Sequence, residues 1–187
     1  KGTYRLTNIP IRGDKCKFGA IDVDQYDGSA DQIKERLNKN ESDLPLIAAA
    51  SKSGGMHLYL FLEDWVMAKD VRCLLKHFAS MLDIKSVDRK TGKEIEPEIF
   101  PKQDKLEKNQ YGNGINLPYY NSLIKKKNLT SPNTPSLEEW IKKALRIRMS
   151  VSKFHEYIDV IPKANSENTK KTKLVTHYEQ LKTKSND

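Results

Sequence analysis

Cysteine is scarce in this chain, and its positions exclude several kinds of site. The 187 residues include two cysteines, Cys16 and Cys73, which lie far apart in the sequence. No Cys-x-x-Cys pair and no Cys/His cluster accompanies them. The sequence therefore predicts neither a disulfide framework nor a zinc site, and it is most consistent with a reducing cytoplasm.

Long apolar runs are missing as well. Hydrophobic residues make up 37% of the chain and charged residues 31%, and no apolar run approaches the roughly 18 residues that a membrane-spanning helix needs. We therefore expect a protein with no membrane partner. The chain starts at Lys1, and no charged and then apolar leader follows. We expect it to be a piece of a longer protein with flanking domains.

Acidic residues are outnumbered by basic ones. The chain has 33 Lys and Arg against 25 Asp and Glu, a net charge of +8 and an isoelectric point near 9.3. This excess favours polyanionic partners, although a plain solvated lysine-rich surface remains the alternative. The densest cationic run comprises Lys125, Lys126 and Lys127, in a stretch rich in Lys, Asn, Ser and Pro that predicts a linker or mobile loop.

The spacing of apolar residues predicts an α+β core followed by helices. Short apolar runs indicate five strands, over 16–24, 44–50, 56–62, 95–100 and 113–117. Apolar residues three and four apart indicate three helices, over 29–38, 64–81 and 136–149, the last with a capping-box-like start. We expect three parts: a core over 1–120, a linker over 121–135 and a helical appendage over 136–187.

Two carboxylates lie close together at the end of the first long strand. Asp22 and Asp24 are two residues apart, so they share one face of the strand and are about 7 Å apart along the backbone. Like charges held together repel unless a cation neutralises them, and hard divalent ions prefer oxygen ligands. The pair is therefore a candidate metal site, and two solvent-facing acids are the alternative.

The connection between the second and third strands is rich in groups that bind phosphate. It runs from Ser51 to His57 and offers two hydroxyls, the Lys52 ammonium, the backbone N–H groups of two glycines and an imidazole. A simple Gly-Gly hairpin with a surface histidine is the alternative. The alternation of the strand places His57 on the same face as Tyr59 and Phe61, which favours a functional role for the imidazole.

A third acid comes from the strand predicted over 95–100. Glu98 stands directly before Ile99-Phe100-Pro101 and can face the acids of a partner strand. Two metal ions that share three carboxylates are the usual arrangement for nucleotidyl transfer. Exposed strand glutamates are the alternative, and Glu96 takes the place of Glu98 if the register differs by two residues.

The order of these three motifs, followed by Tyr-Gly-Asn-Gly-Ile-Asn-Leu-Pro over 111–118, resembles the archaeo-eukaryotic primase superfamily. It is most similar to the primase-polymerases associated with CRISPR arrays and bacterial conflict systems. The resemblance covers about residues 3–120. It implies a primase-polymerase catalytic core, with an RRM-like antiparallel sheet and a second small α/β unit, here followed by C-terminal helices.

The resemblance also implies roles for individual residues. It assigns Asp22, Asp24 and Glu98 to catalysis and to two Mg²⁺ or Mn²⁺ ions. It assigns the incoming triphosphate to Ser51, Lys52, Ser53, Gly54, Gly55 and His57, and further nucleotide or template contacts to Lys102, Gln103, Asn113 and Asn116. Tyr26 is a candidate sugar gate, with a packed surface tyrosine as the alternative. Many members of the family have Asp where this chain has its third acid, Glu98.

The function implied is template-directed nucleotidyl transfer, as in a DNA primase or DNA polymerase of replication or of a CRISPR-associated system. The partners implied are nucleoside triphosphates and a single-stranded DNA template with its primer. We expect a monomeric catalytic domain that uses no protein nucleophile. The alternatives are a single-stranded nucleic-acid-binding module without catalysis, for which the intact acids are unnecessary, and a metal-dependent nuclease.

Overall fold

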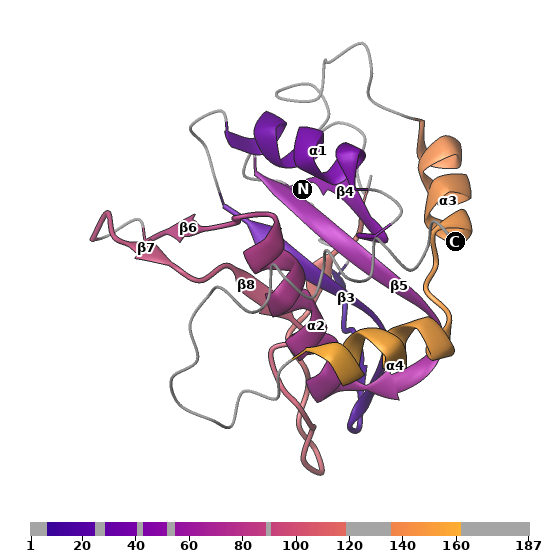
Figure 1. The fold of residues 1–187 in the computed structure, drawn as a ribbon. Coiled ribbons are helices and arrows are strands. Elements are labelled where there is room, and N and C mark those ends of the chain that lie inside the picture. The colour runs from indigo at the N-terminus through magenta and orange to yellow at the C-terminus, as the bar shows by residue number, and fades with distance from the viewer. Residues whose placement is uncertain are drawn as a thin grey trace, which may run out of the picture.

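An antiparallel sheet of five strands forms the centre of the molecule (Figure 1), with the strand order β2-β3-β5-β4 and with β8 also paired to β3. The computed structural model describes residues 7–24, 29–40, 43–51, 55–88, 91–118 and 136–161. The strands of the sheet are β2 (Ile11–Arg12), β3 (Lys15–Val23), β4 (Leu46–Ala50), β5 (Met56–Met67) and β8 (Glu98–Phe100). This arrangement agrees with the expected α+β class.

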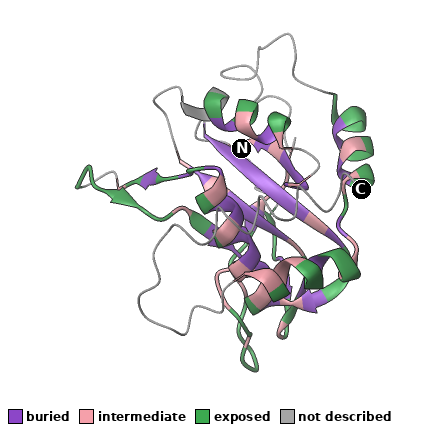
Figure 2. Cartoon of the chain, in the orientation of Figure 1, coloured by how far each residue is buried: buried purple, intermediate pink, exposed green. Residues whose placement is uncertain are grey.

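Alternation along β3 gives the sheet two different faces. Ile21 and Val23 are fully buried in the larger apolar core, together with residues of α1 (Ser29–Lys39) and α2 (Ala68–Met81). Ala20, on the other face, belongs to a smaller apolar cluster. Figure 2 shows buried residues along the central strands and exposed residues along the outer sides of the helices. We call the side that α1 and α2 cover the helix face and the other side the open face.

The hairpin between the second and third predicted strands is confirmed. Strands β4 and β5 pair antiparallel, with Ala50 opposite Met56, and the Ser51 N–H donates to the Gly55 carbonyl at 2.9 Å. A side chain at Gly55 has no room, because a Cβ atom would lie 2.3 Å from the Val23 carbonyl oxygen. The glycine therefore lets the start of β5 lie directly against the end of β3.

The helix predicted over 64–81 starts later than expected. Residues 64–67 belong to β5, and α2 begins at Ala68. Lys15 and Cys16 at the start of β3 pair with Met67 and Val66, so β5 must stay extended to reach them. The apolar spacing that favours a helix is therefore overridden by a strand partner far away in the sequence.

The strand predicted over 95–100 is divided into two. Strand β7 (Glu94–Ile95) forms a hairpin with β6 (Ser86–Val87), and β8 pairs with β3. Pro97 lies in the gap between β7 and β8, where a residue without an N–H is tolerated. The Asp88 N–H donates to the Lys93 carbonyl at 2.9 Å, next to the paired residues of this hairpin.

Two short strands and two helices complete the structure. Strand β9 (Ile115–Asn116), within the region predicted as a strand, pairs with β1 (Thr7–Asn8). The helix predicted over 136–149 ends at Arg146 and is α3 (Leu137–Arg146), with the capping box between Ser136 and Glu139 in place. The last described element is α4 (Val151–Val160).

Helices α3 and α4 pack against opposite faces of the sheet. Trp140 of α3 lies in the cluster on the open face, and its Nε1–H donates to the Ala48 carbonyl at 2.7 Å. Phe154 of α4 is fully buried in the core on the helix face. The expected division at residues 121–135 lies outside the described residues and stays a prediction. In the part of the chain that is described, no helix combines the length and apolar character needed to cross a bilayer.

Candidate active site

Two of the predicted acids and the predicted histidine form one row across three strands. Asp22 on β3 is the Cα partner of His57 on β5 and of Glu98 on β8. Residues directly opposite each other on neighbouring antiparallel strands have Cβ atoms about 4.5–5.5 Å apart, on the same face. The sheet therefore brings together three residues from distant parts of the sequence.

The row lies on the open face, at the end of the sheet where β3 finishes. His57, Tyr59 and Phe61 alternate along β5, as the sequence predicts, and Tyr59 packs in the apolar cluster of that face. Asp24 follows β3 directly, two residues after Asp22. The carboxylates therefore border an apolar surface, where charge interactions are less screened than in bulk water.

Asp22 and His57 are close but not hydrogen-bonded. The Asp22 Oδ1 and His57 Nε2 atoms are 3.4 Å apart, and the His57 side chain is only 7% exposed. Asp22 Oδ1 is buried and has no hydrogen-bond partner among the described residues. A buried carboxylate oxygen without a donor is costly, so this atom is suited to a ligand that carries positive charge.

Tyr59 connects the histidine to strand β9. Its hydroxyl lies 3.1 Å from His57 Nδ1 and donates to the Asn116 carbonyl at 2.7 Å. Burial raises the pKa of Tyr59, and the charge of Asp22 raises it further. The phenol therefore stays protonated across the neutral range. Alternation along the predicted strand places Tyr59 on the face of His57 but indicates no role for it.

Glu98 forms an ion pair with a lysine four residues further along the chain. The Lys102 Nζ atom lies 2.8 Å from Glu98 Oε2 and 5.2 Å from the centre of the Phe100 ring. The Glu98 side chain is 55% exposed. Glu96, the alternative third acid, lies outside β8 and pairs instead with Lys76 at 3.7 Å. The register therefore places Glu98, and not Glu96, opposite Asp22.

The remaining predicted residues fall into two groups. Ser51 and Gly55 flank the hairpin turn, whereas Lys52, Ser53, Gly54 and Tyr26 lie outside the described residues. Gln103 and Asn113 bind each other, with Gln103 Nε2 donating to Asn113 Oδ1 at 2.6 Å. The structure does not include these two in the row of Asp22.

Asp22 and Asp24 are the residues best suited to hold a hard divalent cation. They contribute oxygen ligands, which Mg²⁺ and Mn²⁺ prefer, and Asp22 Oδ1 has no hydrogen-bond partner among the described residues. Across residues 7–24, 29–40, 43–51, 55–88, 91–118 and 136–161, no three His, Cys, Asp or Glu side chains already form a complete ligand set. Glu98 would have to release Lys102 before it could bind a metal ion together with Asp22.

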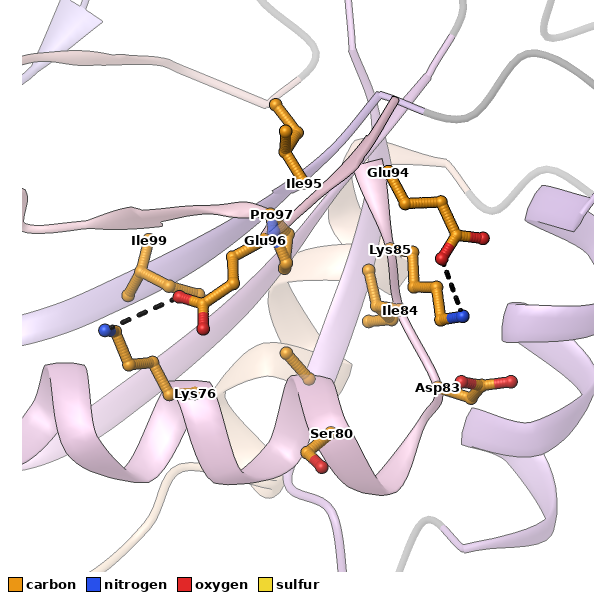
Figure 3. A pocket seen from close by; sticks show the side chains of 11 residues that line it. Lys76, Ser80, Asp83, Ile84, Lys85, Glu94, Ile95, Glu96, Pro97 and Ile99 are labelled. Atoms are coloured by element: carbon orange, nitrogen blue, oxygen red, sulfur yellow. Dashed lines mark hydrogen bonds and ion pairs between the residues drawn. The ribbon is translucent and has the colours of Figure 1, made fainter. Parts of the chain in front are cut away.

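A hollow of about 410 Å³ lies elsewhere, between α2 and the β6–β7 hairpin (Figure 3). Ile99 lines it, and Ile99 points away from the face of Glu98 because side chains alternate along β8. Its charged side chains form ion pairs, Lys76 with Glu96, Lys85 with Glu94, and Asp83 with Arg36 of α1. The hollow therefore belongs to the helix face and takes no part in the acid row.

The α+β architecture, an antiparallel central sheet with helices packed on both faces, fits a primase-polymerase core. The chain belongs to the family of the archaeo-eukaryotic primase domain of TOTE conflict systems, which it matches over residues 2–156. The match extends past the 3–120 region of the sequence resemblance and includes α3. It supports nucleotidyltransferase chemistry in general, with nucleotides and nucleic acid as partners. A search of curated proteins found no match.

Proposed function

We propose that this domain is a template-directed nucleotidyltransferase, a DNA primase or DNA polymerase that joins nucleoside triphosphates. The observation that carries the proposal is the row of Asp22, His57 and Glu98 across β3, β5 and β8. Family membership gives the general chemistry, and the row supplies carboxylates and an imidazole in one place.

The proposed metal ligands are Asp22, Asp24 and Glu98, which would hold two Mg²⁺ or Mn²⁺ ions. When bound, such ions lower the pKa of an attacking 3′-hydroxyl and neutralise charge on the triphosphate. Asp22 provides the fixed end of this site, because strand pairing on both sides of β3 holds it in place. Glu98 is more exposed, and it would become the third metal ligand once its ion pair with Lys102 is broken.

The triphosphate would bind beside this row, at the start of β5 and at the hairpin that precedes it. His57 directs Nε2 toward Asp22, and Ser51 and Gly55 bring hydroxyl and backbone groups to the same end of the sheet. Lys102, once separated from Glu98, can donate to a phosphate oxygen with its ammonium group. The contribution of the chain is then mostly positioning and charge stabilisation.

Primer extension tests the proposal. The domain is incubated with a primed single-stranded DNA template, Mn²⁺ and labelled triphosphates, and products are separated by length. Asp22→Asn should lower extension by about 100-fold or more, because a metal ligand supplies several kcal/mol in the transition state. Asp64→Asn is the matched control, since Asp64 lies on β5 in an exposed ion pair with Lys17 at 3.3 Å.

Three outcomes discriminate among the possible functions. Longer products that require Asp22 support a polymerase or primase. Shorter products that require Asp22 indicate the nuclease instead. Tight binding of single-stranded DNA without any change in length, and without an effect of Asp22→Asn, indicates a binding module. Extension by Asp22→Asn at the wild-type rate contradicts the two-metal assignment.

A further inference from the structure

The two ring nitrogens of His57 have different surroundings. Nδ1 lies 3.1 Å from the Tyr59 hydroxyl, and Nε2 lies 3.4 Å from Asp22 Oδ1. His57 is buried, at 6% exposure, so its ring nitrogens face protein groups more than water. Which nitrogen carries a proton is therefore decided by these neighbours.

The direction of these hydrogen bonds follows from the Asn116 carbonyl, which is the last group in the series from His57 through Tyr59. The Asn116 carbonyl can only accept, so the Tyr59 hydroxyl donates its single proton there, at 2.7 Å. The Tyr59 oxygen has then only lone pairs left for His57. A hydrogen bond between them requires that His57 Nδ1 carries the proton and donates it.

The Tyr59 ring has little freedom to turn away from this position. It is 2% exposed, stacks on Phe61 with 5.9 Å between ring centres, and meets Trp140 edge-on at 6.0 Å. Trp140 is itself anchored through its hydrogen bond to the Ala48 carbonyl. Side chains from β5 and α3 therefore fix the hydroxyl on one side of the imidazole.

We infer that Tyr59 is a positioning residue, which holds His57 in the Nδ1–H form through the Tyr59 hydroxyl and the Asn116 carbonyl, and so keeps Nε2 directed at Asp22 and the open face. The use of Nε2 for a nucleoside triphosphate rests on the proposed function. The arrangement of protons does not, because it follows from the buried hydrogen bonds alone.

The arrangement also determines which ring nitrogen faces Asp22. With Nδ1 bound to the Tyr59 hydroxyl, Nε2 is the nitrogen beside Asp22 Oδ1, at 3.4 Å. Asp22 Oδ1 is buried and has no hydrogen-bond partner among the described residues, so it remains suited to a cation or to a donor hydrogen.

A long-range ¹H–¹⁵N NMR spectrum of the histidine rings tests the inference without any nucleotide. The spectrum is recorded at alkaline pH, where a neutral ring shows its tautomer, and His57→Asn identifies the His57 signals. The wild-type protein should show the Nδ1–H pattern. Tyr59→Phe should shift the signals toward the Nε2–H form, because the ring keeps its packing but loses the acceptor.

Tyr157→Phe is the matched control. The Tyr157 hydroxyl also donates to a backbone carbonyl, that of Asp43 at 2.5 Å, but Tyr157 packs with the core on the helix face. This variant loses a comparable hydrogen bond and should leave the His57 spectrum unchanged. A wild-type Nε2–H pattern, or identical His57 signals in the wild-type and Tyr59→Phe proteins, overturns the inference.

The functional part is tested by the binding of a triphosphate and by steady-state extension. Tyr59→Phe should weaken triphosphate binding roughly three- to tenfold and raise KM more than it lowers kcat, as expected for a lost neutral hydrogen bond. Equal losses in Tyr59→Phe and Tyr157→Phe would mean a merely structural role. If the wild-type protein binds no triphosphate, the proposed function fails, while the NMR result still decides the role of Tyr59.

Discussion

At the scale of single residues, the proposed site depends on two wholly or partly buried polar groups whose hydrogen bonding is incomplete or unusual. Asp22 is a partly buried acid with an unpaired oxygen, and His57 is a buried imidazole that contacts it. Ordinary surface acids are satisfied by water or by lysine, as Asp64 is by Lys17. This difference supports the proposal that Asp22 and His57 belong to the active site.

Replacing His57 with Ala should weaken triphosphate binding by about 1.5–3 kcal/mol, the usual value of a hydrogen bond to a charged group. Template binding should be largely spared, because it depends on phosphate contacts spread over the basic surface. Fluorescence titrations of the same preparation with a triphosphate and with single-stranded DNA separate the two effects. Unchanged triphosphate affinity would leave His57 with a structural role only.

At the scale of the elements, the geometry of the site depends on how closely β3 and β5 approach. Gly55 permits this approach at the point where β3 ends and β5 begins. On the helix face Gly19 has a similar function, since a Cβ atom there would lie 2.6 Å from Leu75 Cδ1. Glycine is required at both places because any side chain would push neighbouring elements apart.

Gly55→Ala should therefore lower stability and activity together. The added methyl group would lie 2.3 Å from the Val23 carbonyl oxygen, a backbone atom that cannot move without shifting β3. We expect a loss of about 1–3 kcal/mol in the free energy of unfolding, the usual cost of overpacking. Urea denaturation measures it, and a stability equal to that of the wild-type protein would show that β3 and β5 separate easily.

At the scale of the whole molecule, the buried thiol and phenol groups make the free energy of unfolding depend on pH in the alkaline range. Burial raises the pKa of the Cys16 thiol from 9.0 to about 12 and that of Tyr157 from 10.0 to about 12. The pKa of Tyr59 is raised for the same reason. The folded state thus holds these protons more firmly than the unfolded state does. The contribution of these groups to the free energy of unfolding is therefore fully present below about pH 9.

The free energy of unfolding should fall as the pH rises from about 9 toward 12, because the unfolded chain loses these protons first. Urea midpoints measured at a series of alkaline pH values test this. Tyr157→Phe should be less stable at neutral pH but should show a shallower decline, since it has one such group fewer. A constant midpoint over this range would contradict the burial of these side chains.

The sequence by itself determined the types of most elements and the faces of their residues. Two-residue alternation sets which side of a strand a residue occupies, so His57 and Tyr59 could be assigned to a common face. The hairpin at Gly55 and the capping box at Ser136 are likewise local, since each depends on residues only a few positions apart.

Only the tertiary structure decided which strands are neighbours. The pairing of β8 with β3 selects Glu98 over Glu96, and the pairing of β5 with Cys16 delays the start of α2 to Ala68. The contact of Tyr59 with Asn116 spans 57 positions in the sequence. Such contacts depend on packing and hydrogen bonds across the whole sheet, and local periodicity contains no information about them.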